Sequence, residues 1–200
     1  VYFDRFLIGA VLTMTAVTYY VTPYEVVYRL QILPNSMMLV LFPALTTALT
    51  IDKERLTSIY ARASKILLLL MLPVLSAFFL LAPEALEIWL GPDFRRMSTP
   101  VVQWMAVGML TNTLARLPFT VLQSAGRPDL VAKTHLAELI PYAALLWIFT
   151  NQFGIAGTAA AWFLRVLADT FILNVIARFK VPELNETVIR TMGWLGGLLA

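Results

Sequence analysis

Long apolar blocks separated by short polar breaks dominate this sequence. A helix needs about 20 mostly apolar residues to cross the hydrocarbon core of a bilayer. Period-two alternation is missing from the blocks, which argues against membrane β-strands and leaves helices as the predicted spanning elements. The pattern therefore predicts an all-α, polytopic membrane helix bundle with about six transmembrane helices, at residues 1–20, 24–46, 63–83, 99–121, 131–151 and 155–178.

The breaks between the blocks carry residues that favour turns. They are Thr22-Pro23, the Gly91-Pro92-Asp93 run, residues 126–129 and residues 151–154. Short connections predict antiparallel neighbours and an up-down bundle over residues 1–180. We expect residues 181–200 to form a cytoplasmic linker and, from Thr191 onward, the start of a further transmembrane helix.

Composition supports the membrane interpretation and excludes several kinds of chemistry. Hydrophobic residues make up 60% of the chain and charged residues only 14%, against roughly a quarter charged in soluble domains. With no cysteine and one histidine, we expect no thiol nucleophile, no metal site, no cofactor and no nucleic-acid partner. The sequence starts at Val1 and ends inside an apolar run, so we expect a piece of a longer polytopic protein.

Basic residues predict the orientation of the bundle. Two of them, Arg95 and Arg96, fall in the loops on one side if the spans alternate. Cytoplasmic loops of membrane proteins carry an excess of Lys and Arg. The cytoplasmic side is therefore predicted to be the opposite one, which receives eight basic residues, Lys53, Arg55, Arg62, Lys65, Arg127, Lys133, Arg178 and Lys180.

Several charges lie within the apolar blocks, where ionic groups usually face the bundle interior or one another. Arg116 has no acidic residue within four positions, so it needs a partner from another helix or an anionic ligand. Because arginine binds phosphate oxygens in a bidentate manner, Arg29, Arg116 and Arg165 are candidates for a cationic cavity that holds a phosphate-bearing substrate. The alternative is neutralisation on one helix face, for which the pairs Glu25–Arg29 and Arg165–Asp169 have the required spacing.

The remaining charged candidates allow two interpretations. His135 and Glu138 either titrate and couple transport to protons, or anchor a helix end at the membrane interface. Asp4, Glu25 and Asp169 are likewise candidates for ion coupling or for ion pairs. The aromatic residues are predicted to form interface belts rather than a sugar-stacking platform, although a few can do both; they are Tyr19, Tyr20, Tyr24, Trp89, Trp104, Trp147 and Trp162.

Ordered short motifs give a resemblance to a known family. The chain opens with Asp4-Arg5-Phe6-Leu7-Ile8-Gly9, and Leu41-Phe42-Pro43 follows in the second block. Further motifs are Trp89-Leu90-Gly91-Pro92-Asp93-Phe94, Gly126-Arg127-Pro128, and the small-residue run 154–161 before Trp162, Arg165 and Asp169. Over residues 1–180 the chain resembles the polysaccharide-export (Wzx-type) flippases of the MATE-like, or MOP, transporter superfamily.

The resemblance implies a fold and a function. It implies a V-shaped pair of six-helix bundles with alternating access, in which this chain is the second bundle and the N-terminal six-helix half is its partner. Such multi-pass proteins are not enzymes; they move undecaprenyl-pyrophosphate-linked oligosaccharide across the bacterial inner membrane for surface polysaccharides such as the O-antigen of lipopolysaccharide. Expected partners are the lipid-linked oligosaccharide, membrane lipids and, as a further candidate, a polysaccharide polymerase.

Three alternatives stay open. A cation-coupled multidrug efflux pump of the same superfamily would favour acidic cavity residues, whereas the unpaired charge here leans toward arginine. A lipid II flippase shares the expected fold. A membrane-embedded glycan polymerase or glycosyltransferase would need a sizeable loop with catalytic carboxylates, and the longest loop expected is the short stretch at 84–99.

Overall fold

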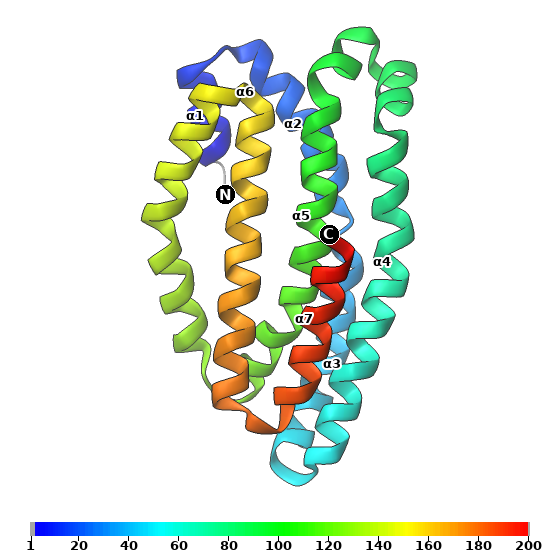
Figure 1. The fold of residues 1–200 in the computed structure, drawn as a ribbon, viewed down its shortest axis with the longest axis vertical. Helices are drawn as coiled ribbons and strands as arrows, with labels where there is room; N and C mark the ends of the chain where they lie inside the picture. The colour runs from blue at the N-terminus through cyan, green and yellow to red at the C-terminus, as the bar shows by residue number, and fades with distance from the viewer. Residues whose placement is uncertain (1–2, 200) are drawn as a thin grey trace.

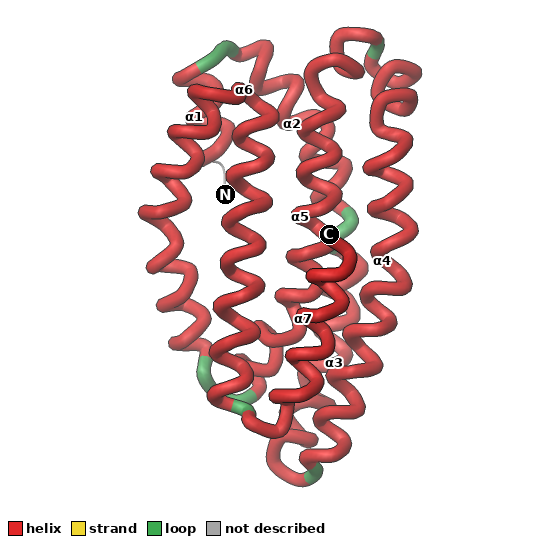
Figure 2. Tube along the Cα trace, in the orientation of Figure 1, coloured by secondary structure: helices red, strands yellow, loops and turns green. Residues whose placement is uncertain are grey.

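The computed structural model describes residues 3–199 and consists, over that range, of helices joined by short turns. Figure 2 shows the helices and the turns between them. An all-α bundle is therefore confirmed. The helices are α1 (Phe3–Val11), α2 (Met14–Arg29), α3 (Ile32–Ile51), α4 (Lys53–Leu90), α5 (Pro92–Ser124), α6 (Pro128–Lys180), the 3-10 helix η1 (Pro182–Leu184) and α7 (Asn185–Leu199).

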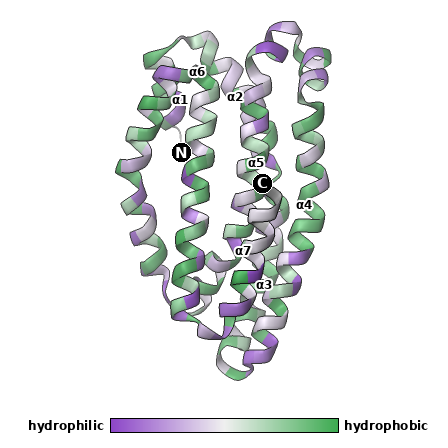
Figure 3. Ribbon diagram, viewed as in Figure 1, coloured by the Kyte–Doolittle hydropathy of each residue, from purple (hydrophilic) through white to green (hydrophobic). Residues whose placement is uncertain are grey.

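Length and apolar composition make this a multi-pass membrane protein. Four helical stretches within the described residues are long and apolar enough to cross a membrane: Met14–Ile51, Lys53–Leu90, Pro92–Ser124 and Pro128–Lys180. Large apolar side chains on α4, such as Leu69 and Leu80, are exposed, as expected of a surface that faces lipid. Figure 3 shows how hydrophobic residues follow these rods.

The later part of the first predicted span and the whole of the second form one rod, Met14–Ile51, so the predicted turn at Thr22-Pro23 is wrong. Pro23 lies inside α2, and α2 passes into α3 through Leu30 and Gln31, which both keep helical backbone angles. Proline removes a single N–H and has a helical φ, so a long membrane helix can continue through it. The actual break comes earlier, where Thr13 caps α2 by accepting a hydrogen bond from the N–H of Ala16 at 3.1 Å.

Helix α6 folds back on itself near its middle. Gly154 has φ 61° and ψ −144°, a conformation that favours glycine. The chain reverses there, so residues 128–153 form a first leg and residues 155–180 an antiparallel second leg (Figure 1). The legs touch closely beside this turn: the hydroxyls of Thr150 and Thr158 are 2.9 Å apart, and a Cβ on Gly157 would lie 2.1 Å from the carbonyl oxygen of Phe149.

Helix α5 forms the centre of the bundle. It packs against α2, α3, α4 and α6. The most apolar part of α5 is 72% buried, whereas that of α4 is only 28% buried. Met105, Met109 and Leu114 of α5 belong to the main core together with Ile8 and Tyr20. Because α5 contacts so many elements, its polar side chains lie where several helices converge.

The turns divide between the two ends of the bundle in the way the basic residues require. The turns at Asp52, at residues 125–127 and at Val181 lie together at the lower end in Figure 1, and those at Gly91 and Gly154 lie at the upper end. The predicted orientation does not depend on the wrong turn at Pro23. All the loops whose basic residues set the orientation come after Ile51, the end of the rod formed by α2 and α3.

The C-terminal segment packs back onto the bundle. After Val181 and η1, α7 begins at Asn185, earlier than the predicted Thr191, and contacts α4. Lys53 forms an ion pair with Glu183, and its hydrogen bond lowers the pKa of that carboxyl. The linker predicted within residues 181–200 is therefore short and held against the start of α4.

The orientation leads to a labelling prediction. In a cysteine-free full-length protein, Lys53→Cys and Arg127→Cys should react with a membrane-impermeant thiol reagent only after the inner membrane is opened. Arg95→Cys should react in intact spheroplasts, because it lies at the opposite end of the bundle. Mass-tag gel shifts measure the labelling, and the reverse pattern would invert the orientation.

Candidate functional site

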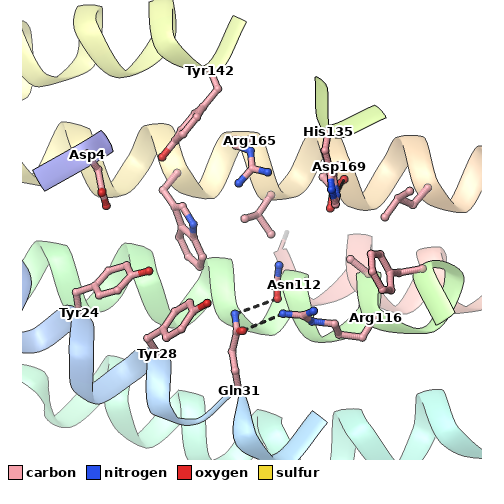
Figure 4. A pocket seen from close by; sticks show the side chains of 15 residues that line it. Asp4, Tyr24, Tyr28, Gln31, Asn112, Arg116, His135, Tyr142, Arg165 and Asp169 are labelled. Carbon is pink, nitrogen blue, oxygen red and sulfur yellow. Dashed lines mark hydrogen bonds and ion pairs between the residues drawn. The ribbon is translucent and has the colours of Figure 1, made fainter. Parts of the chain in front are cut away.

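A cavity of about 200 Å³ lies where α1, α2, α5 and both legs of α6 converge. We call it the central cavity. Its walls carry ionic, amide and aromatic side chains (Figure 4). The polar and aromatic residues that line it are Asp4, Tyr24, Tyr28, Gln31, Asn112, Arg116, Phe119, His135, Tyr142, Trp162, Arg165 and Asp169.

Arg116 on α5 is held by two neutral amide side chains. Its guanidinium donates a hydrogen bond from Nη2 to Oε1 of Gln31 at 2.8 Å, and Nε2 of Gln31 donates to Oδ1 of Asn112 at 3.2 Å. Figure 4 shows this chain of contacts from α5 to the junction of α2 and α3. The Nε of Arg116 is buried without a hydrogen-bond partner, and no carboxylate within residues 3–199 lies at ion-pair distance. Since arginine offers five donors, Arg116 keeps capacity for an anionic ligand.

The acidic and basic residues of α6 pair between its two legs. Nε of Arg165 lies 3.5 Å from Oε2 of Glu138, and Nε2 of His135 lies 3.3 Å from Oδ1 of Asp169. The predicted Arg165–Asp169 pair on one helix face is thus replaced by partners on the opposite leg. The reason is the reversal at Gly154, which sets residues 135 and 138 opposite 169 and 165 in antiparallel register.

A second set of ionic contacts joins α1 to α2. Arg5 pairs with Glu25 and lies over the ring of Tyr24. The predicted Glu25–Arg29 pair is therefore wrong, because the chain reversal between α1 and α2 brings Arg5 to Glu25. Arg29 is exposed and does not line the central cavity.

Asp4 is 4% exposed, in agreement with its predicted inward position. Oδ2 of Asp4 accepts a hydrogen bond from the Tyr20 hydroxyl at 3.0 Å, and Oδ1 accepts one from the N–H of Arg5 at 3.0 Å. Two contacts therefore satisfy this buried carboxylate, as a low-dielectric interior requires.

The cavity contains charges of both signs, which differs from the predicted cationic lining. Arg116 and Arg165 contribute the positive charge, and Asp4 and Asp169 line the same space. Asp4 has hydrogen-bond donors, whereas Oδ1 of Asp169 lies 3.3 Å from His135 without a hydrogen bond, and the hydrogen-bond partner of Arg116 among residues 3–199 is a neutral amide. Arg116 is therefore a cation of this cavity that has no carboxylate at ion-pair distance within residues 3–199.

Aromatic residues form much of the remaining wall. Tyr24 and Trp162, which were predicted as interface belts, line the cavity, and Tyr28 and Tyr142 join them. The rings of Tyr24 and Tyr28 stack with centroids 5.2 Å apart. The lining is therefore aromatic as well as ionic.

Sequence reasoning missed the uncharged polar residues Gln31, Asn112 and Tyr28. One signal was available: Asn112 precedes Arg116 by four positions, so both occupy one face of a helix. Gln31, which is only 6% exposed, is an amide in an apolar block. Because it carries no charge, its sequence position did not predict a place in the cavity.

Pairing between the legs can be tested by double-mutant cycles on the purified full-length protein. The cycle of Arg165→Gln with Glu138→Gln should give a coupling free energy of about 1 kcal/mol or more, since contacting ionic groups are not additive. The matched cycle of Arg165→Gln with Asp169→Asn should give a smaller value. Unfolding in detergent measures both, and a larger coupling to Asp169 would contradict the observed pairing.

Comparison with known proteins adds two matches. The family described as "Polysaccharide biosynthesis protein" matches residues 2–100. A Shigella flexneri protein named "Putative O-antigen transporter" is 31% identical over 174 residues, which cover 87% of this chain and 41% of that protein. No solved structure gives a significant match.

The matches agree with the resemblance in the short motifs and with the multi-pass helical fold. The chain spans about two fifths of the length of the relative from Shigella flexneri. The family match falls on α1 to α4 and the start of α5, and the alignment with the relative covers most of the chain. Residues 2–100 therefore match the polysaccharide biosynthesis protein family, and the alignment with the Shigella flexneri relative extends the similarity over most of the chain.

Proposed function

We propose that the protein containing this chain is a flippase that moves an undecaprenyl-pyrophosphate-linked oligosaccharide across the bacterial inner membrane for surface polysaccharide biosynthesis. In this proposal the chain supplies the second of two bundles, and the two bundles alternate between inward-open and outward-open states. A polysaccharide polymerase that receives the product is a further proposed partner. The family match and the name of the Shigella flexneri relative support this choice.

The observation that carries the proposal is the uncompensated arginine in the central cavity. An arginine among apolar helices is costly to bury, roughly 2.5–3.5 kcal/mol at the centre of a bilayer on insertion scales. The Gln31 and Asn112 amides orient Arg116 but do not neutralise it. A pyrophosphate supplies the missing negative charge and accepts bidentate hydrogen bonds from a guanidinium. Arg165 lines the same cavity and can contact the ligand from the second leg of α6.

The rest of the cavity suits a sugar next to a phosphate. The amide of Asn112 and the hydroxyls of Tyr24, Tyr28 and Tyr142 offer hydrogen bonds of both senses. Tyrosine and tryptophan rings add apolar area with polar edges. A polar headgroup could thus cross between bundles while its lipid chain stays in the bilayer, with no covalent step.

The alternatives fit the cavity less well. A pump for cationic drugs would use free carboxylates, whereas Asp4 already accepts two hydrogen bonds and Asp169 faces His135 at 3.3 Å. A membrane glycosyltransferase would need an extramembrane loop with catalytic carboxylates, and the turn between α4 and α5 is the single residue Gly91. Lipid II shares the polyprenyl pyrophosphate, so a lipid II flippase differs only in the sugar.

The test is glycan export in cells that depend on the full-length protein. Arg116→Ala should lower export at least tenfold at equal membrane abundance, and Arg116→Lys should restore part of it, because lysine keeps the charge but loses the bidentate geometry. Arg29→Ala is the matched control and should export normally, since Arg29 lies outside the cavity.

Surface glycan on gels reports export, and an epitope tag reports abundance. Normal export by Arg116→Ala would remove the central cavity from the transport path. Equal loss in Arg29→Ala would show that any lost arginine impairs the protein, and would contradict the specific role of Arg116.

A further inference from the structure

A second hollow lies between the two legs of α6, and the flippase proposal makes no use of it. We call it the lateral groove. Its volume is about 590 Å³, nearly three times that of the central cavity. Ala137, Pro141 and Leu145 of the first leg and Leu164, Ala168 and Ile172 of the second form its apolar walls.

The lateral groove and the central cavity lie on opposite faces of the α6 hairpin. On the second leg the groove takes Leu164 and Ala168, whereas the cavity takes Val166 and Asp169. Successive residues of a helix are 100° apart, so residues 166 and 168 point in nearly opposite directions. Tyr142 and Arg165 line both spaces. The groove and the cavity are therefore neighbours that share one wall.

The shared wall consists of Tyr142 and Arg165, and Arg165 makes only a long contact with Glu138 of the groove. Arg165 and Glu138 are 3.5 Å apart, and neither carboxylate oxygen of Glu138 has a hydrogen-bond partner. The legs are tight beside the turn, where Gly157 contacts Phe149, and pack again at their other end, where Val131 and Leu173 share a buried cluster. Along residues 133–145 they leave room for the groove.

Charge in the groove favours an anionic amphiphile. Lys133 lies near the end of the bundle that carries most basic residues, and its side chain is 75% exposed. Two basic residues, Lys133 and Arg165, line the groove with one carboxylate, Glu138, and Lys133 also lies 3.6 Å from Asp129 at the exposed end. An apolar trough with a basic side chain at its exposed end and an arginine on its inner wall matches a lipid that has a long chain and a phosphate.

We infer that the lateral groove seats the polyprenyl chain of the lipid-linked substrate, with its phosphate at Arg165, beside the central cavity. The inference rests on the proposed flippase function and adds a loading position on the cytoplasmic half of α6. The chain lies between the legs of α6 in contact with the bilayer, while the phosphate reaches Arg165 from the groove side. Arg165 then contacts the phosphate from either space, because it lines both.

Photolabelling of the full-length protein in nanodiscs tests the groove. The probe is a polyprenyl phosphate with a diazirine in its chain, and a phosphatidylglycerol with the same diazirine forms the second arm. The polyprenyl probe should label peptides within 133–145 and 164–172, and unlabelled polyprenyl phosphate should compete with it. Equal labelling by phosphatidylglycerol without such competition would assign the groove to bulk lipid and overturn the inference.

Substitutions that fill the lateral groove with a large side chain, and one that fills another groove, give matched variants for the labelling test. Ala168 and Ala137 are exposed on its opposite walls, so Ala168→Trp and Ala137→Trp add bulk without entering the core. Each should reduce groove labelling at least fivefold. The control is Ala77→Trp, which fills a separate apolar groove between α2 and α4 and should leave labelling unchanged.

Thermal unfolding in detergent checks that the variants remain folded, and either groove variant alone suffices for the test. Undiminished labelling in a folded Ala168→Trp or Ala137→Trp protein would overturn the inference. The flippase proposal would still stand in that case if export depends on Arg116. Loss of that dependence with intact groove labelling would overturn the flippase site instead.

Discussion

An ionic group inside an apolar helix bundle has to be compensated, and this constraint determines where the charges of the chain lie. Insertion of one charge at mid-bilayer costs roughly 2.5–3.5 kcal/mol on insertion scales. Asp4 meets that cost through Tyr20 and Arg165 through Glu138, while His135, 3.3 Å from Asp169, balances that carboxylate only when the imidazole is protonated. Arg116 has only amide partners, so the same constraint marks it as a place where a ligand completes the structure.

The constraint also explains why the α6 hairpin matters for the site. The reversal at Gly154 brings two charged stretches of one helix into register, which sets Arg165 opposite Glu138 and His135 opposite Asp169. The legs are in close contact at Gly157, whereas around Glu138 the carboxylate oxygens have no hydrogen-bond partner among the described residues. The central cavity lies on one face of this hairpin and an apolar groove on the other. An amphipathic lipid could thus be held with its chain and its headgroup in different surroundings.

Sequence patterns predicted the fold class, the later spans and the turns at Gly91 and Gly154. Those features depend on local sequence. A run of about 20 apolar residues predicts a span, and a glycine favours the positive φ that the turns at Gly91 and Gly154 adopt. The same reasoning failed at Pro23, because a proline weakens a helix by one hydrogen bond and does not by itself end it. The rod formed by α2 and α3 continues through Pro23 and packs along its length against α5.

The site was predicted only in part, for a related reason. Helical spacing pointed to Glu25–Arg29 and Arg165–Asp169, yet the observed partners are Arg5 and Glu138 from other segments. Local spacing carries no information about which segment folds alongside. Burial of Arg116 and Arg165 near the cavity followed from their charge, whereas Gln31, being neutral, gave no such signal.

Equilibrium binding of a sugar-free polyprenyl pyrophosphate to the full-length protein in nanodiscs tests the central claim most directly. The comparison is between the wild-type protein and Arg116→Gln, which keeps a polar side chain of similar reach but removes the positive charge. If the uncompensated arginine is the phosphate site, the variant should bind at least tenfold more weakly, a difference of about 1.4 kcal/mol. Equal affinity of the two proteins would contradict the account, because Arg116 would then have no anionic ligand to bind.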